Sequence, residues 1–264
     1  MADQDTAAVV LRAEQVVAGY VKGLPIVHGA SLHVMRGEVV TIIGPNGAGK
    51  STLMKAIAGL IGIESGHVTL LGHEVTGQPA EAVVAAGLGY VPQTGNVFTT
   101  LTIHENLRVG GHLLRSGEMT ARLERAYQTF PVLAAKRRDR ARTLSGGQRQ
   151  MLAIARALMT DPAVVMLDEP TAGLAPKVVQ EVFDRLRVLA AGGVGVLIVE
   201  QNAKGALRNA DRGVVLVEGR NHLDGAAAAL LADPAVGAAF LGGAAGRAAT
   251  QLPSGAPAPQ ETRS

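Results

Sequence analysis

One segment of the sequence has the residue types and spacing needed to bind phosphate groups. Residues 44–51 read Gly-Pro-Asn-Gly-Ala-Gly-Lys-Ser and match G-x-x-x-x-G-K-[ST] between an apolar run and a helical pattern. The glycines allow backbone N–H groups to turn toward phosphate oxygens at the positive end of a helix. Lys50 is predicted to reach the β- and γ-phosphates of a nucleoside triphosphate, and Ser51 to bind Mg²⁺. The predicted nucleotide-binding residues are Gly44, Pro45, Asn46, Gly47, Ala48, Gly49, Lys50, Ser51 and Thr52.

Two adjacent carboxylates form the next candidate group. Asp168 and Glu169 follow the apolar run 164–167. Ligands of open α/β sheets bind at the carboxyl ends of strands, so both side chains are expected beside the phosphates. Asp168 would bind Mg²⁺, directly or through water, and Glu169 would polarise an attacking water. An alternative is that the pair caps a helix after Pro170. Since no acceptor-site signature for a kinase is present, the sequence favours nucleotide hydrolysis.

Alternating strands and helices must position these residues. Three short apolar runs are typical of strands covered on both faces, as in a mostly parallel sheet, and occupy 39–43, 164–167 and 196–199. Other patterns predict helices at 51–61, at 149–159 and after Pro176, and a hairpin at 214–223. Between about 104 and 160 the pattern is helical, which indicates an inserted helical subdomain.

Composition excludes several classes of protein. Apolar residues make up 47% of the 264 residues, so most of the chain is expected to fold. Seven aromatic residues (Tyr 3, Phe 4, Trp 0) and a net charge of +3 argue against nucleic-acid binding. With no cysteine, disulfides and thiolate chemistry are excluded. No signal peptide or membrane-spanning run is expected. The small-residue and Pro composition of residues 244–264 predicts a flexible tail.

Residues 144–148, Leu-Ser-Gly-Gly-Gln, precede the helical pattern at 149–159 and suit an anion site at a helix N-terminus. With the phosphate loop, they make the chain resemble the ABC-transporter ATPases over roughly residues 10–243. The resemblance implies an α/β P-loop NTPase fold of the ABC ATPase type: a mixed sheet core, an antiparallel β element and a helical subdomain at about 96–160, within a domain of residues 8–243. ATP and Mg²⁺ are the implied cofactors. A second ATPase subunit would complete a head-to-tail dimer, in which the γ-phosphate held by the partner subunit's phosphate loop is bound by Ser145, Gly146, Gly147 and Gln148.

The resemblance also assigns single positions. Tyr20 matches the aromatic ring under the adenine, although a core or surface tyrosine is an alternative. Gln93 matches the glutamine that contacts Mg²⁺ and the attacking water; a glutamine bonded to its own loop is the alternative. Gln201 stands where the family usually has a histidine bonded to the γ-phosphate, and Ala175 stands where it usually has an aspartate. Besides these, Val97, Phe98 and Leu101 either receive the membrane subunit's coupling helix or belong to the core.

The sequences GLAPK and VEQNA and the residues 240–243 resemble the LivF-type ATPases of branched-chain amino acid importers. That resemblance implies a LivG-like ATPase partner, two integral membrane permeases and, indirectly, a periplasmic or surface solute-binding protein. The chain would then lie on the cytoplasmic face of the inner membrane and hydrolyse ATP to power import. Its own ATP site is hypothesised to be slower than the partner's, because of Gln201.

Three alternatives to this function stay open. The first is an importer ATPase for urea, short amides or other amino acids. The second is a soluble ABC ATPase that remodels ribosomes or DNA complexes, supported only by the basic run 136–142, which we interpret as a solvated helix face. The third is a regulatory nucleotide-binding module without useful hydrolysis, which Gln201 and Ala175 suggest.

Overall fold

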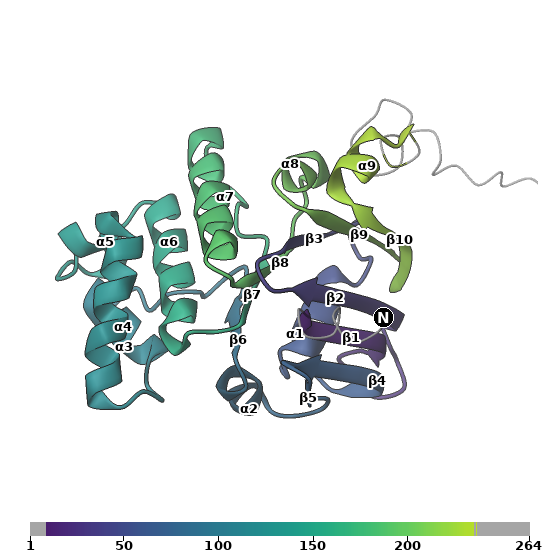
Figure 1. Ribbon diagram of the computed structural model, residues 1–264, viewed down its shortest axis with the longest axis horizontal. Helices are drawn as coiled ribbons and strands as arrows, with labels where there is room; N and C mark the ends of the chain where they lie inside the picture. Colours follow the sequence, from purple (N-terminus) through teal and green to yellow (C-terminus); the bar gives the residue numbers. More distant parts are fainter. Residues whose placement is uncertain (1–8, 235, 237–264) are drawn as a thin grey trace, which may run out of the picture.

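Two β-sheets form the centre of the computed structural model, which describes residues 9–234 and 236 (Figure 1). One sheet is antiparallel, with strand order β2-β1-β4-β5, and the other has the order β10-β9-β3-β8-β7-β6. Strands β3, β6, β7, β8 and β9 pair in parallel, and β10 pairs antiparallel with β9. The strands are β1 (Val9–Ala18), β2 (Val27–Met35), β3 (Val39–Ile43), β4 (Ile63–Leu70), β5 (His73–Glu74), β6 (Leu88–Val91), β7 (Val164–Asp168), β8 (Gly195–Val199), β9 (Arg212–Val217) and β10 (Arg220–Ala226).

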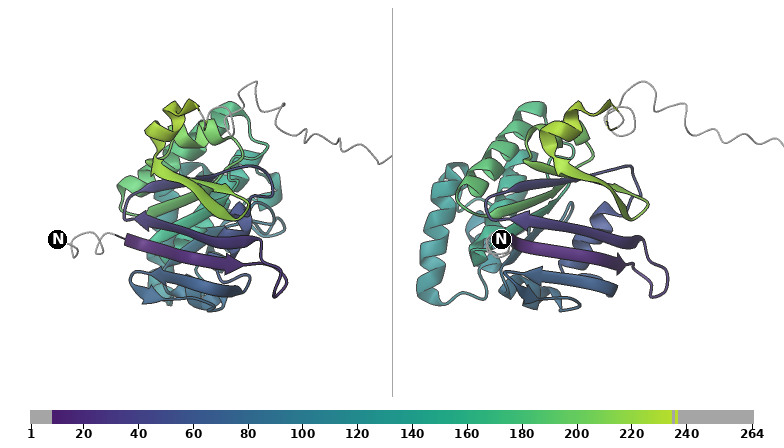
Figure 2. Two further views of the ribbon diagram at one scale, coloured as in Figure 1. Left: turned by 90° about the vertical axis from the view of Figure 1, so that its right-hand side faces the viewer. Right: turned by 45° about the vertical axis from the view of Figure 1, so that its right-hand side comes forward.

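The helices pack around both sheets, and α3 to α6 are set apart from the others (Figure 1). Helix α1 lies between the two sheets, whereas α3 to α6 form a separate group on the far side of α7 from the antiparallel sheet (Figures 1 and 2). The helices are α1 (Lys50–Ile57), α2 (Ala80–Ala85), α3 (Ile103–Gly110), α4 (Ser116–Thr129), α5 (Pro131–Ala135), α6 (Gly146–Ala157), α7 (Pro176–Ala191), α8 (Ala203–Arg208) and α9 (Ala227–Ala232).

The central strands are buried on both faces, which explains their continuous apolar sequence. In β3, Val40 and Ile42 pack in the core shared with the antiparallel sheet and α1. Val39 and Ile43 pack in the opposite core, which is shared with α6 and α7. The predicted strands at 39–43, 164–167 and 196–199 are thereby confirmed, as is the mixed α/β fold.

Some predicted boundaries were wrong. Helix α1 ends at Ile57 instead of 61 because Gly59 adopts φ +70°, where an added Cβ would lie 2.4 Å from the Gln78 carbonyl oxygen. The hairpin between β9 and β10 turns at Glu218 and Gly219 alone. Residues 136–138 form turns, Arg140 forms an isolated β-bridge with Thr102, and residues 141–143 form a short 3₁₀ segment, so the basic run is not a helix face.

The region between residues 103 and 160 contains α3 to α6 and a terminal 3₁₀ turn at 158–160, and the structure assigns it no strand. Thr102 opens it with a capping box, in which its side chain accepts from the Glu105 backbone. No helix in the described part of the chain is long and apolar enough to span a bilayer. The predicted tail and residues 240–243 lie outside the described residues.

Candidate nucleotide-hydrolysis site

The predicted phosphate loop joins β3 to α1. Gly44 adopts φ +150° against β9, and a Cβ there would lie 2.0 Å from the Leu216 carbonyl oxygen. Gly49 stands at the N-cap position of α1 in the left-handed region, with φ +90°. Both positions therefore require glycine, and they turn the chain so that α1 begins directly at Lys50.

Lys50 folds back over this loop. Its ammonium donates to the carbonyl oxygens of Gly44 and Pro45, both at 2.9 Å, and the residue is only 7% exposed. Burial lowers the Lys50 pKa, while the nearby Glu169 and Asp168 act in the opposite direction. A cation is thus held at the mouth of the loop, within reach of an anion bound there.

Ser51, the residue after Lys50, is hydrogen-bonded to Asp168. The Ser51 hydroxyl donates to Asp168 Oδ1 at 2.8 Å, and burial raises the Asp168 pKa despite this bond. Across the described residues, no group of three or more His, Cys, Asp and Glu side chains could hold a metal ion. A hydroxyl and a single carboxylate fit Mg²⁺, which keeps waters and substrate phosphates among its ligands.

Three parallel strands bring the remaining catalytic candidates to one edge. Strands β6, β7 and β8 are adjacent, and Gln93, Glu169 and Gln201 follow their carboxyl ends. Gln93 Nε2 donates to Glu169 Oε2 at 2.6 Å, and Gln201 Nε2 lies 3.0 and 2.9 Å from the two Glu169 oxygens. The carboxylate is thus held by two neutral amides.

This arrangement decides two alternatives. Helix α7 begins only at Pro176, and Ala175 occupies its N-cap position, so the helix-cap interpretation of Asp168 and Glu169 is wrong. Gln93 bonds to Glu169, which follows the neighbouring strand β7, whereas the alternative expected Gln93 to bond to the backbone of its own loop.

Tyr20 lies in the connection between β1 and β2, beside α1. Its side chain is 56% exposed, so the core interpretation is wrong. The Lys55 ammonium donates to the Tyr20 hydroxyl at 3.1 Å and lies 5.3 Å from the ring centroid. An exposed ring near the phosphate loop is suited to stacking on a base.

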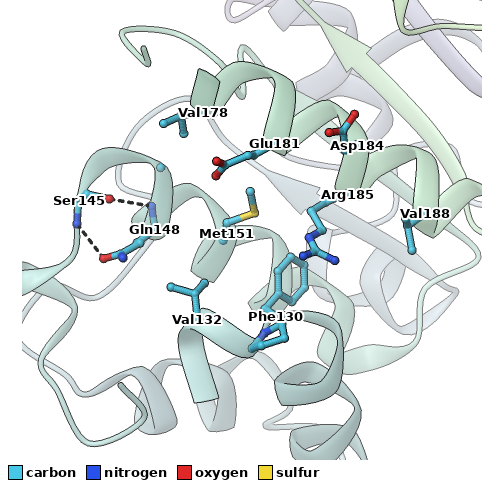
Figure 3. A pocket seen from close by; sticks show the side chains of 12 residues that line it. Phe130, Val132, Ser145, Gln148, Met151, Val178, Glu181, Asp184, Arg185 and Val188 are labelled. Carbon is cyan, nitrogen blue, oxygen red and sulfur yellow. Dashed lines mark hydrogen bonds between the residues drawn. The ribbon is translucent and has the colours of Figure 1, made fainter. Parts of the chain in front are cut away.

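Residues 145–148 lie apart from this cluster, at the start of α6. Ser145 caps α6: its side chain accepts from the Gln148 backbone, and its own N–H donates to Gln148 Oε1, both at 3.3 Å (Figure 3). A Cβ on Gly147 would lie 2.2 Å from Val178 Cγ1, so glycine is what permits α6 to approach α7. These two helices and α5 enclose a cleft with a volume of about 430 Å³. Ser145 and Gln148 lie at one end of it (Figure 3).

The segment after Gln93 has mixed burial. Val97 is half-buried and packs against the core, whereas Phe98 is 47% exposed with the Arg156 guanidinium 5.1 Å from its ring centroid. Leu101 is half-buried. Docking of a membrane subunit on this segment stays a prediction.

Two contacts were missed from the sequence. Glu200 is 3% exposed and accepts hydrogen bonds from Thr171, and Lys55 bonds to Tyr20. A charged residue directly after an apolar strand, at position 200, was the only available signal for the first of them.

Comparisons with known proteins identify the family that the chain resembles in sequence and fold. The family description "ABC transporter" matches residues 27–172. The chain is 41% identical to the high-affinity branched-chain amino acid transport ATP-binding protein BraG of Pseudomonas aeruginosa, over 86% of this chain and 97% of BraG. It is 42% identical to the probable branched-chain amino acid transport ATP-binding protein LivF of Archaeoglobus fulgidus, over 84% and 94%. The ADP conformation of MJ1267, an ATP-binding cassette of an ABC transporter, superposes with a TM-score of 0.80 at 29% identity, over 89% of this chain and 99% of that one.

Proposed function

Because the chain belongs to the ABC transporter family of ATP-binding proteins, we propose that it is the ATP-hydrolysing subunit of an importer of branched-chain amino acids. The observation that carries the proposal is the hydrogen bond from Ser51 of the phosphate loop to Asp168, the residue next to Glu169. The cargo is inferred from BraG and LivF, whose names specify branched-chain amino acid transport.

In the proposed reaction, the loop amides and Lys50 bind the ATP phosphates, and Tyr20 stacks on the adenine. Lys50 exchanges its two loop carbonyls for phosphate oxygens. Ser51, Asp168 and Gln93 are the residues that would hold Mg²⁺, which neutralises charge on the phosphate oxygens when bound. Since Asp168 already accepts from Ser51, its carboxylate is oriented before nucleotide arrives.

Glu169 is the proposed base. It orients a water for in-line attack on the γ-phosphate and takes its proton, a role worth about 10² to 10⁴ in rate. Gln93 and Gln201 keep the carboxylate in place through their amide donors. The amide of Gln201 is neutral, so it cannot bring to the γ-phosphate the positive charge that a protonated histidine would carry. We therefore propose that this site turns over more slowly than a site with a histidine there.

A second ATPase subunit completes the proposed site. ATPases of this family form dimers and pair with permease subunits. Residues 145–148 form the N-terminus of α6 with its N-cap, a position suited to binding an anion, and we propose that they bind the γ-phosphate of ATP held by the partner. The proposed partners are a LivG-like ATPase, two integral membrane permeases and, indirectly, a periplasmic or surface solute-binding protein. The chain itself would lie on the cytoplasmic face of the inner membrane.

Reconstitution tests this function. The chain would be purified with its permeases and partner ATPase, placed in liposomes and supplied with the solute-binding protein and ATP. ATP-dependent accumulation of labelled leucine, isoleucine or valine is expected. Accumulation of urea or short amides instead would refute the proposed cargo, and ATP turnover without any transport would refute the importer.

A further inference from the structure

Glu200 is a buried acidic residue with no part in the reaction described above. It follows β8 directly and is 3% exposed. Its Oε1 accepts from the Thr171 backbone N–H at 3.0 Å and from the Thr171 hydroxyl at 2.8 Å. Burial raises the Glu200 pKa, and the bonds from Thr171 oppose that shift. An acidic group is costly to bury, so these two bonds are strongly favoured in this position.

The bonds from Thr171 secure one end of a short turn that contains Glu169. The other end is secured because the Glu169 N–H donates to the Val199 carbonyl oxygen at 2.9 Å. The two acceptors are consecutive residues, Val199 at the end of β8 and Glu200 directly after it. The turn is therefore fastened to the neighbouring strand on both sides of Pro170.

Glu169 needs these two anchors because its backbone conformation is unfavourable. Its φ is +48°, in the left-handed region that residues with a Cβ rarely adopt. Such conformations persist only where the surroundings fix them. Any relaxation of this turn would move the Glu169 carboxylate away from the amides of Gln93 and Gln201.

We propose that Glu200 is a positioning residue for Glu169: by binding both donors of Thr171, it holds the turn that aims the hydrolytic carboxylate. The inference rests on the proposed ATPase function. Glu200 itself does not touch substrate. Its contribution is to keep Glu169 within the narrow range of positions from which a water can be oriented.

Substitutions at Glu200 test the proposal in the assembled transporter. Glu200→Leu removes the acceptor at similar size and is expected to lower kcat by on the order of 10- to 100-fold, as for a misplaced catalytic group. The KM for ATP should stay unchanged, because the phosphate loop is untouched. Glu200→Gln keeps Oε1 as an acceptor for both donors and should recover most of the lost turnover.

A matched control separates positioning from stability. Glu38 is a half-buried glutamate, bonded to Arg212 at the opposite end of β3 from the phosphate loop. Glu38→Leu should lower the Tm without lowering kcat. If Glu200→Leu lowers only the Tm, as Glu38→Leu does, or raises KM by as much as it lowers kcat, the positioning role is refuted.

Two further variants keep the test decisive if Glu200→Leu does not fold. Thr171→Val removes only the hydroxyl bond and should slow turnover, whereas Thr171→Ser should not. In a Glu169→Gln background, Thr171→Val should cause no further loss, because the carboxylate that it positions is already absent. An equal loss in both backgrounds would overturn the proposal. A wild-type complex that hydrolyses no ATP would instead refute the proposed function itself.

Discussion

Replacing Glu169 by glutamine should remove the hydrolytic base while leaving the fold nearly as stable as before. The carboxylate accepts bonds from Gln93 and Gln201 through both oxygens. An amide oxygen in the place of Oε2 still accepts from both glutamines, and only the second Gln201 bond, to Oε1, is lost, at a net cost of about 1 kcal/mol. The loss of the base should lower kcat by about 10² to 10⁴, equivalent to roughly 3 to 5 kcal/mol in the barrier. Turnover should therefore collapse while the Tm falls only slightly.

Phosphate release by the assembled transporter measures this effect, with Glu81→Gln as the matched control. Glu81 is an exposed glutamate in α2, so the control makes the same charge change away from the site. The Glu169→Gln complex should also accumulate ATP-bound closed dimers, visible by size exclusion with ATP. Near-normal turnover of this variant would refute the assignment of Glu169 as the base.

Three other predictions follow from the same geometry. Burial raises the Asp168 pKa, so the ionised carboxylate destabilises the fold at neutral pH. This destabilisation shrinks as the pH falls through the raised pKa and is gone below the ordinary pKa of an aspartate. Asp168→Asn should therefore raise the Tm at neutral pH but not in acid, and it should abolish turnover. Gly147→Ala should lower the free energy of unfolding by about 1 to 3 kcal/mol by overpacking against Val178, and adding Val178→Ala should restore it. Denaturant titrations measure this, and unchanged stability of the Gly147→Ala variant would contradict the close approach of α6 to α7. Tyr20→Ala should weaken ATP binding by about 1 to 3 kcal/mol through lost stacking, while Tyr20→Phe keeps it; equal affinities by calorimetry would exclude adenine stacking.

Local patterns predicted much of the fold. The strands at 39–43, 164–167 and 196–199 were identifiable because each is a short apolar run with no solvent-facing positions. The phosphate loop could be placed because its glycines and Lys50 fall between such a run and a helix. Both signals lie within a dozen residues of sequence.

Contacts between distant segments could not be predicted in the same way. The sequence placed Gln93, Glu169 and Gln201 after strands, but their hydrogen bonds depend on the order β6-β7-β8, which no local pattern specifies. The bond between Glu200 and Thr171 joins residues 29 positions apart. By contrast, the end of α1 at Ile57 could have been predicted locally from Gly59, but the apolar residues continue at helical spacing to residue 61 and favoured a longer helix.

The central claim is that one chain supplies only part of each hydrolytic site. The most direct test measures ATP turnover per ATPase pair across a dilution series of this chain with its partner ATPase. We predict that turnover per chain falls toward zero as the pair dissociates and returns when either subunit is added in excess. A rate per chain that stays constant far below the dissociation constant of the pair would contradict the account.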